Sequence, residues 1–168
     1  MSGWLALIAA AGAVWMDLRM QKVSNWFILT GLAAGAVYRL FTEGLSGIAA
    51  FAAGAFCPIL ILGILFIFGA LGAGDIKLFA VLGGMMGVRQ VMQCMLWAFL
   101  LGGALSFIIL LSCGGIRRRL AYFVQYFQLL FITKQIRPYR EGSGRGASIH
   151  FTVPVLMSVL LYMGGIYR

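Results

Sequence analysis

The apolar residues of this chain form long stretches that only short charged or polar segments interrupt. Six such stretches run approximately over residues 2–16, 26–41, 45–72, 76–88, 91–112 and 151–167. Apolar residues make up 62% of the 168 positions and charged residues only 10%, whereas a soluble domain averages about 45–50% and about 25%. Too few polar residues remain to cover a water-soluble globule, and the chain is too apolar to be disordered. The sequence therefore predicts an all-α, polytopic helical bundle in a membrane.

The fourth stretch, residues 76–88, decides how many times the chain crosses the membrane. It is shorter than the roughly 17–25 residues of an average span. However, one helix over residues 76–112 would be more than about 50 Å long, which is far beyond the thickness of a bilayer. We therefore expect a turn at residues 87–90 and about six transmembrane helices, in a single membrane-embedded domain that covers residues 1–168. The 23 glycines favour close packing between such helices.

The basic residues predict the orientation of these helices. The net charge is +9, and ten of the 13 basic residues fall in the first, third and fifth loops between the stretches. These ten are Arg19, Lys22, Lys77, Arg117, Arg118, Arg119, Lys134, Arg137, Arg140 and Arg145. The positive-inside rule places these loops in the cytoplasm and both termini outside. Because membrane topology accounts for the basic charge, no nucleic-acid partner is expected.

The fifth loop, residues 113–150, is long enough to hold structure of its own. Apolar residues recur at helical spacing over residues 116–133, behind the arginine triplet at 117–119. This pattern predicts a cytoplasmic interfacial helix that contacts anionic lipid, with a buried or re-entrant helix as the alternative. Residues 138–148 are rich in Gly, Ser and Arg and are predicted to be flexible.

Four carboxylates occur in the chain, and in such an apolar sequence each needs an explanation. Glu43 lies in a short outer loop within reach of Arg39, and Glu141 lies in the basic fifth loop. Both are expected to be solvated. Asp17 ends the first apolar stretch and Asp75 precedes the fourth, and the predicted topology places them on the same side of the membrane at similar depth.

Two carboxylates that meet at a membrane edge match the requirement of an aspartic protease. One carboxylate takes a proton from water, and the protonated partner polarises the scissile carbonyl. Gly72 and Gly74 leave space in which an extended substrate backbone can approach Asp75. Local alternatives remain open, because Asp17 can cap a helix or pair with Arg19. Asp75 can likewise serve as an N-cap with Lys77 as its partner.

Other catalytic chemistries lack the residues that they need. His150 is the only histidine, and three scattered cysteines without a CxxC pair do not supply a metal site. No metal and no cofactor is expected. Cys57 and Cys94 lie inside apolar stretches and are expected to pack as small apolar side chains.

Two motifs connect these residues to a known family. Asp17 is followed by Arg19 and, after three residues, by Val-Ser-Asn at 23–25, and residues 72–78 read Gly-Ala-Gly-Asp-Ile-Lys-Leu. Together with the number and order of the spans, these motifs resemble the type IV prepilin peptidases, which are GxGD aspartic proteases of the prokaryotic cytoplasmic membrane. The resemblance implies that Asp17 and Asp75 are the catalytic pair. It also implies a prepilin-like substrate, which is cleaved after its short basic leader.

The chain departs from the larger members of that family. Those enzymes carry an N-terminal region with paired CxxC zinc ligands and also N-methylate the new terminus, so the small stand-alone form without N-methyltransferase activity is expected here. Ser24 stands where a proline is common before the asparagine. Asn25 is expected to cap the second span or to bind substrate, and Lys77 to help shape the site.

Two other classes of function remain as alternatives. In a small proton- or cation-coupled transporter, Asp17 and Asp75 would bind the cation. In a membrane assembly subunit, the same residues would have no catalytic role. The sequence contains no pattern that predicts an oligomeric state.

Overall fold

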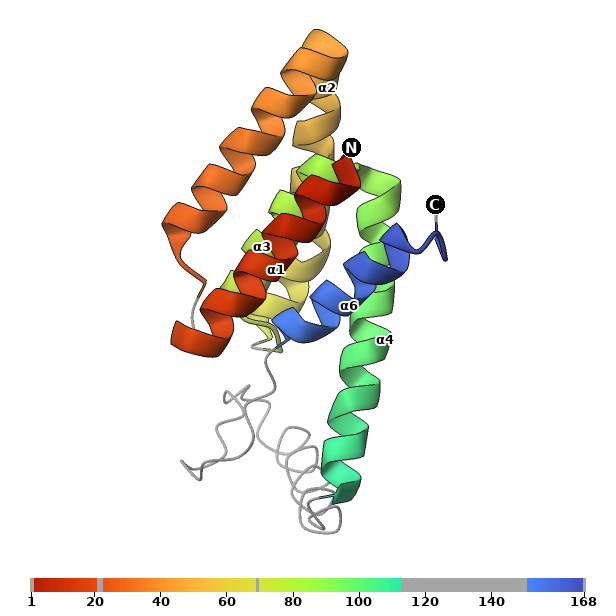
Figure 1. Ribbon diagram of the computed structural model, residues 1–168. Coiled ribbons are helices and arrows are strands. Elements are labelled where there is room, and N and C mark those ends of the chain that lie inside the picture. The colour runs from red at the N-terminus through yellow and green to blue at the C-terminus, as the bar shows by residue number, and fades with distance from the viewer. Residues whose placement is uncertain (1, 21–22, 69, 113–150, 168) are drawn as a thin grey trace. The chain divides into compact units, whose positions relative to one another are not determined.

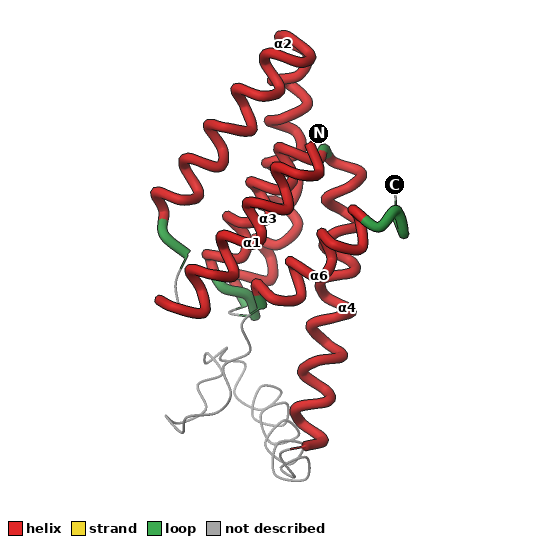
Figure 2. Tube along the Cα trace, in the orientation of Figure 1, coloured by secondary structure: helices red, strands yellow, loops and turns green. Residues whose placement is uncertain are grey.

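The computed structural model describes residues 2–20, 23–68, 70–112 and 151–167, and within these ranges every regular element is an α-helix (Figure 1). Figure 2 shows the same elements as helices, with the described loops in green. The helices are α1 (Ser2–Met20), α2 (Asn25–Ile67), α3 (Ala73–Met86), α4 (Val88–Ser112) and α6 (Thr152–Met163). The all-α prediction is confirmed for this part of the chain.

Several predictions concern residues outside these ranges. They are the interfacial helix at 116–133, the flexible segment at 138–148, and the roles of Glu141 and His150.

Helix α2 consists of two helical halves that meet at Gly44. Gly44 has φ 66° and ψ −147°, which is not a helical conformation and which glycine adopts without the steric cost of a side chain. The chain reverses its direction there (Figure 1). This break separates the stretches predicted at 26–41 and 45–72. The outer loop expected at 42–44 is shorter than predicted, because Thr42 and Glu43 continue the helix and only Gly44 departs from it.

A second glycine separates α3 from α4. Gly87 has φ 97°, and α4 begins at the next residue, Val88. The turn predicted at residues 87–90 is therefore present, but it is confined to Gly87. Arg89 and Gln90 are helical, since a glycine with positive φ reverses the chain without needing further loop residues.

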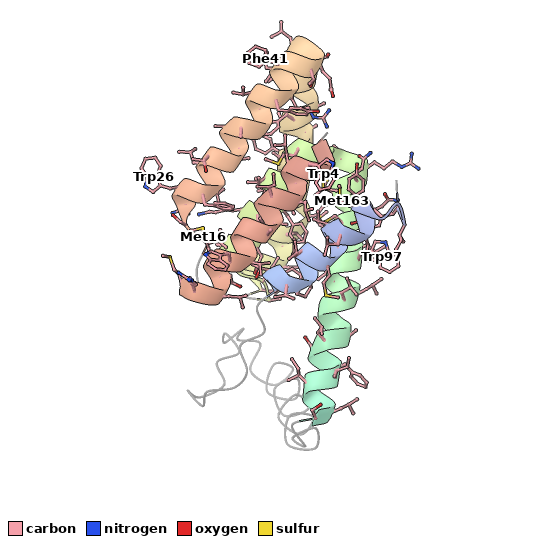
Figure 3. The ribbon with its side chains drawn as sticks, in the orientation of Figure 1. Trp4, Met16, Trp26, Phe41, Trp97 and Met163 are labelled. Carbon is pink, nitrogen blue, oxygen red and sulfur yellow. The ribbon has the colours of Figure 1, made fainter. Side chains whose placement is uncertain are left out.

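Three of the described helical segments are long and apolar enough to cross a membrane, namely Gly3–Met20, Asn25–Ile67 and Val88–Ile109. Helix α6 is apolar but shorter. Large apolar side chains project from the helices (Figure 3), and the exposed fraction is 76% for Trp26 and 85% for Phe41. Such a surface is unfavourable in water and favourable against lipid. The structure is that of a membrane protein.

The chain divides into two compact units. The first comprises Met1–Gly102 with His150–Arg168, and it contains α1, α2, α3, α6 and the first part of α4. The second comprises Gly103–Ile149, of which the structure describes the remainder of α4. All contacts discussed below lie within the first unit. The single domain over residues 1–168 stays a prediction.

Helix α3 forms the core of the first unit. Nine consecutive residues, 78–86, are buried, and the helix packs against both α1 and α2. At its closest contact with α2, Gly83 lies against Gly54, and a Cβ atom on either glycine would overlap the carbonyl oxygen of the other. Backbones approach so closely only where neither residue has a side chain.

The end of α3 near Gly87 is bound to α2 by one arginine. Arg39 forms an ion pair with Glu43 one turn further along α2, whereas the sequence predicted only a solvated Glu43 within reach of Arg39. Its Nη2 also donates a hydrogen bond of 3.2 Å to the carbonyl oxygen of Met85. Arg39 therefore satisfies one of the carbonyl groups that the end of α3 leaves without a helical partner.

The contact between Gly54 and Gly83 predicts that an added methyl group lowers stability at Gly54 but not at every glycine of α2. Gly54→Ala should lower the free energy of unfolding by about 1–3 kcal/mol or more, because the new Cβ forces α2 away from α3. Gly63→Ala is the matched control on the same helix, since a Cβ there meets no atom within 4 Å. It should leave stability unchanged or raise it slightly. Unfolding of the purified protein in detergent measures both, and equal effects would contradict the packing described.

Candidate active site

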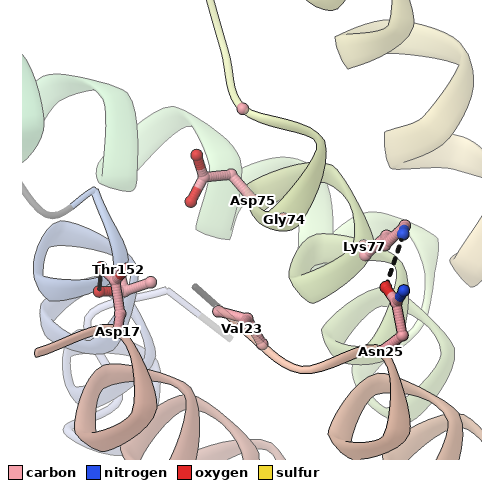
Figure 4. A pocket seen from close by; sticks show the side chains of 8 residues that line it. Asp17, Val23, Asn25, Gly74, Asp75, Lys77 and Thr152 are labelled. Atoms are coloured by element: carbon pink, nitrogen blue, oxygen red, sulfur yellow. Dashed lines mark hydrogen bonds between the residues drawn. The ribbon is translucent and has the colours of Figure 1, made fainter. Parts of the chain in front are cut away.

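Eight residues line a cavity of about 380 Å³ in the first unit (Figure 4). They come from the end of α1, the segment before α2 and the first residue of α2, the N-cap and first turns of α3, and the start of α6. The lining residues are Asp17, Val23, Asn25, Gly72, Gly74, Asp75, Lys77 and Thr152. The structure therefore brings together all six residues that the sequence analysis selected for the site. It adds Val23, from the first motif, and Thr152, which was not predicted.

Asp17 occupies the penultimate turn of α1 and faces the start of α6. The hydroxyl of Thr152 donates a hydrogen bond of 2.8 Å to Oδ2 of Asp17, and Thr152 is only 2% exposed. The two residues are 135 positions apart. Only its position in the sequence could have indicated Thr152 as a site residue. It is a hydroxyl residue at the start of the last apolar stretch, on the side of the membrane where Asp17 is predicted to lie.

Asp75 lies in the first turn of α3, outside the three segments that are long enough to cross a membrane. The N-cap of α3 is Gly72, and the N–H of Asp75 donates to its carbonyl oxygen at 3.2 Å. The alternative in which Asp75 is the N-cap is therefore wrong. Burial, followed by the negative charge of Asp17, raises the pKa of the Asp75 carboxyl to about 6, against a hydrogen bond with the Gly72 backbone that lowers it.

The two glycines of the motif have different surroundings. A Cβ on Gly72 would lie 3.1 Å from Oδ2 of Asp75, whereas a Cβ on Gly74 would meet no atom within 4 Å. A side chain at position 72 would therefore crowd the carboxylate itself. A side chain at position 74 would project into open space beside the cavity that this residue lines.

Lys77 and Asn25 interact across the cavity from α3 and α2. The Lys77 Nζ donates a hydrogen bond of 2.8 Å to Oδ1 of Asn25 (Figure 4). Lys77 is therefore not the ion-pair partner of Asp75 that one alternative proposed. Asn25 does not cap α2 either, since the N-cap is Ser24, whose Oγ accepts the N–H of Trp26 at 3.3 Å.

Within the described ranges, no three residues among His, Cys, Asp and Glu come together as a metal site would require. Cys94 is buried and accepts a hydrogen bond from Ser158, and the Cys57 sulfur lies 3.6 Å from the Met92 sulfur. Both cysteines pack among the helices, as expected.

The sequence profile of the type IV leader peptidase family matches residues 4–107, more than half of the chain. The chain belongs to this family. The predicted family resemblance is thereby confirmed, and membership implies a peptidase. The matched residues include all six predicted site residues, whereas Thr152 lies beyond the match. Nothing supports the transporter alternative. Comparisons with curated proteins and with solved structures gave no match.

The surroundings of Asp75 predict a carboxyl group that titrates near pH 6. Since the pKa is raised, the protonated form should persist at about pH 5 and be lost by about pH 7.5. Infrared difference spectra of the purified protein detect the protonated carboxyl band directly. The band that disappears over this range should be missing in Asp75→Asn and present in Glu43→Gln. A band that persists in Asp75→Asn would contradict the assignment.

Proposed function

We propose that this protein is an aspartic-type endopeptidase that removes the leader of prepilin-like precursors at the cytoplasmic face of the membrane. One observation carries the proposal: Asp17 and Asp75, from two different helices, line the same cavity in a member of a leader peptidase family. The Asp17 charge also raises the pKa of Asp75. Close carboxylates hold one proton between them more readily than they both ionise.

This arrangement supports hydrolysis by water without a covalent intermediate. The ionised carboxylate takes a proton from water, and the water oxygen forms a bond with the scissile carbonyl carbon. The protonated carboxyl gives its proton to the carbonyl oxygen. In the second step the C–N bond breaks, the amine nitrogen receives the proton that came from water, and the other carboxyl recovers its own. The products are a leader with a new carboxyl end and a pilin with a new amine.

The other lining residues suit an extended substrate backbone. Gly72 and Gly74 keep the approach to Asp75 clear, and an extended chain presents unpaired carbonyl and N–H groups. Lys77 and Asn25 place hydrogen-bond donors along the same cavity. We assign these four residues to shaping the site and binding substrate.

The proposed topology has six spans in one domain over residues 1–168. The two halves of α2 count as separate spans, and the part of α3 that follows Asp75 is a short span enclosed by protein. With both termini outside, the cavity faces the cytoplasm of a prokaryotic cell. The basic loop at 113–150 then contacts the anionic lipid of the inner leaflet.

The catalytic assignment predicts that either aspartate is indispensable. Asp17→Asn and Asp75→Asn keep the side-chain size but remove ionisation, so each should reduce leader cleavage by at least about 1,000-fold while the protein still inserts. Glu43→Gln is the matched control, because it makes the same change in a residue that pairs with Arg39 and does not line the cavity. Immunoblots of a co-expressed prepilin record leader loss. Full cleavage by either Asp variant would refute the pair.

The topology predicts opposite accessibility for two exposed positions. In a background without the three native cysteines, Glu43→Cys should react with a membrane-impermeant thiol reagent added to intact cells. Ala70→Cys, between α2 and α3, should react only after the cells are lysed. Labelling of Ala70→Cys in intact cells would overturn the orientation.

A further inference from the structure

Asp17 and Asp75 line the same cavity but have different hydrogen-bond partners. Asp75 is in the first turn of α3, whereas Asp17 is near the C-terminal end of α1 and contacts the first residue of α6. The negative end of α1 and the positive end of α6 act in opposite directions on the charge of Asp17, so the helix dipoles do not account for an ionised Asp17. The hydroxyl of Thr152 does distinguish the two aspartates, because it donates to Asp17.

We propose that Thr152 is a positioning residue whose hydroxyl holds Asp17 as the ionised member of the pair, which makes Asp17 the general base and Asp75 the general acid. This inference rests on the proposed peptidase function and assigns the two roles within it. In the first step Asp17 therefore takes the proton from water, and Asp75 gives its proton to the carbonyl oxygen. In the second step Asp17 protonates the leaving amine nitrogen, and Asp75 recovers its proton.

The local structure of α6 leaves the Thr152 hydroxyl available to donate its hydrogen bond to Asp17. The residue before it, Phe151, is the N-cap of α6 and makes no side-chain capping bond, so the helix begins without using a hydroxyl. Thr152 is almost fully buried, and water therefore competes little for its hydrogen bond. A hydrogen bond from a hydroxyl to a carboxylate stabilises the ionised form, and it is stronger than a hydrogen bond between two neutral groups.

Two basic side chains belong to the helices that carry the pair. On α1, the Arg19 guanidinium lies 4.6 Å from the centre of the Trp15 ring, and on α3 the Lys77 amine is bound to Asn25. Asp75, in contrast, has a pKa raised by burial and by the charge of Asp17. Asp75 is therefore suited to be the protonated member of the pair.

The test compares variants of Thr152 in the purified full-length protein. The substrate is a prepilin precursor with a short basic leader that ends in glycine. Thr152→Val keeps the shape and removes the hydroxyl, and Thr152→Ser keeps the hydroxyl. Thr152→Val should lower kcat about ten-fold with little change in KM. Because the carboxylate that activates water loses a hydrogen bond, the acid limb of the pH profile should move to higher pH. Thr152→Ser should retain the parent profile.

Ser158→Ala is the matched control. Ser158 is a buried hydroxyl on the same helix, but it donates to the Cys94 carbonyl oxygen at 2.8 Å and does not line the cavity. This variant should keep the pH profile even where its yield is lower. The midpoint of a pH profile does not depend on the amount of folded enzyme, so poor yield of Thr152→Val does not obscure the result.

The outcomes separate the two proposals. A parental kcat and acid limb in Thr152→Val would overturn the role of Thr152, and so would equal impairment in Thr152→Ser. Inactive Asp17→Asn and Asp75→Asn beside a parental Thr152→Val would leave the peptidase proposal standing and refute only the positioning. Cleavage that survives both aspartate substitutions would refute the peptidase proposal itself.

Discussion

The burial of α3 against the backbone of α2 is the constraint on which the site depends. A helix of 14 residues is only about 21 Å long, which is less than the roughly 30 Å thickness of the hydrocarbon core. Such a helix is stable in a membrane when protein surrounds it. The contact between Gly54 and Gly83 allows α2 to approach closely enough to do this. Asp75 is thereby carried into the bundle beside α1.

The two ends of α3 have different surroundings. At its C-terminal end, Arg39 binds the Met85 carbonyl and Gly87 leads directly into α4. At its N-terminal end, the first turns of α3 line the cavity, and Gly72 and Gly74 have no side chains that would occupy it. Unpaired N–H groups at a helix start need polar surroundings in an otherwise apolar bundle. Under the proposed function, the same cavity would admit the water that hydrolysis consumes.

Much of the fold and most of the site were predictable from the sequence, because carboxylates and chain-breaking glycines are costly in an apolar chain. The break between the second and third stretches falls at Gly44, and the predicted turn after the fourth falls at Gly87. Asp17 and Asp75 were selected because a charge in such surroundings rarely persists without a function. The glycines before Asp75 then favoured a chemistry in which a substrate backbone approaches a carboxylate, although a transporter and an assembly subunit remained as alternatives.

The sequence by itself determined the helical architecture, the membrane environment and the six motif residues that line the cavity. Only the tertiary structure decided which side chains bind one another. It joined Lys77 to Asn25, 52 positions away, and Thr152 to Asp17, 135 positions away. Hydropathy and motif spacing report which end of a helix a residue occupies, whereas a hydrogen bond depends on the rotation and depth of two helices. These follow from close contacts such as that between Gly54 and Gly83, which no local pattern specifies.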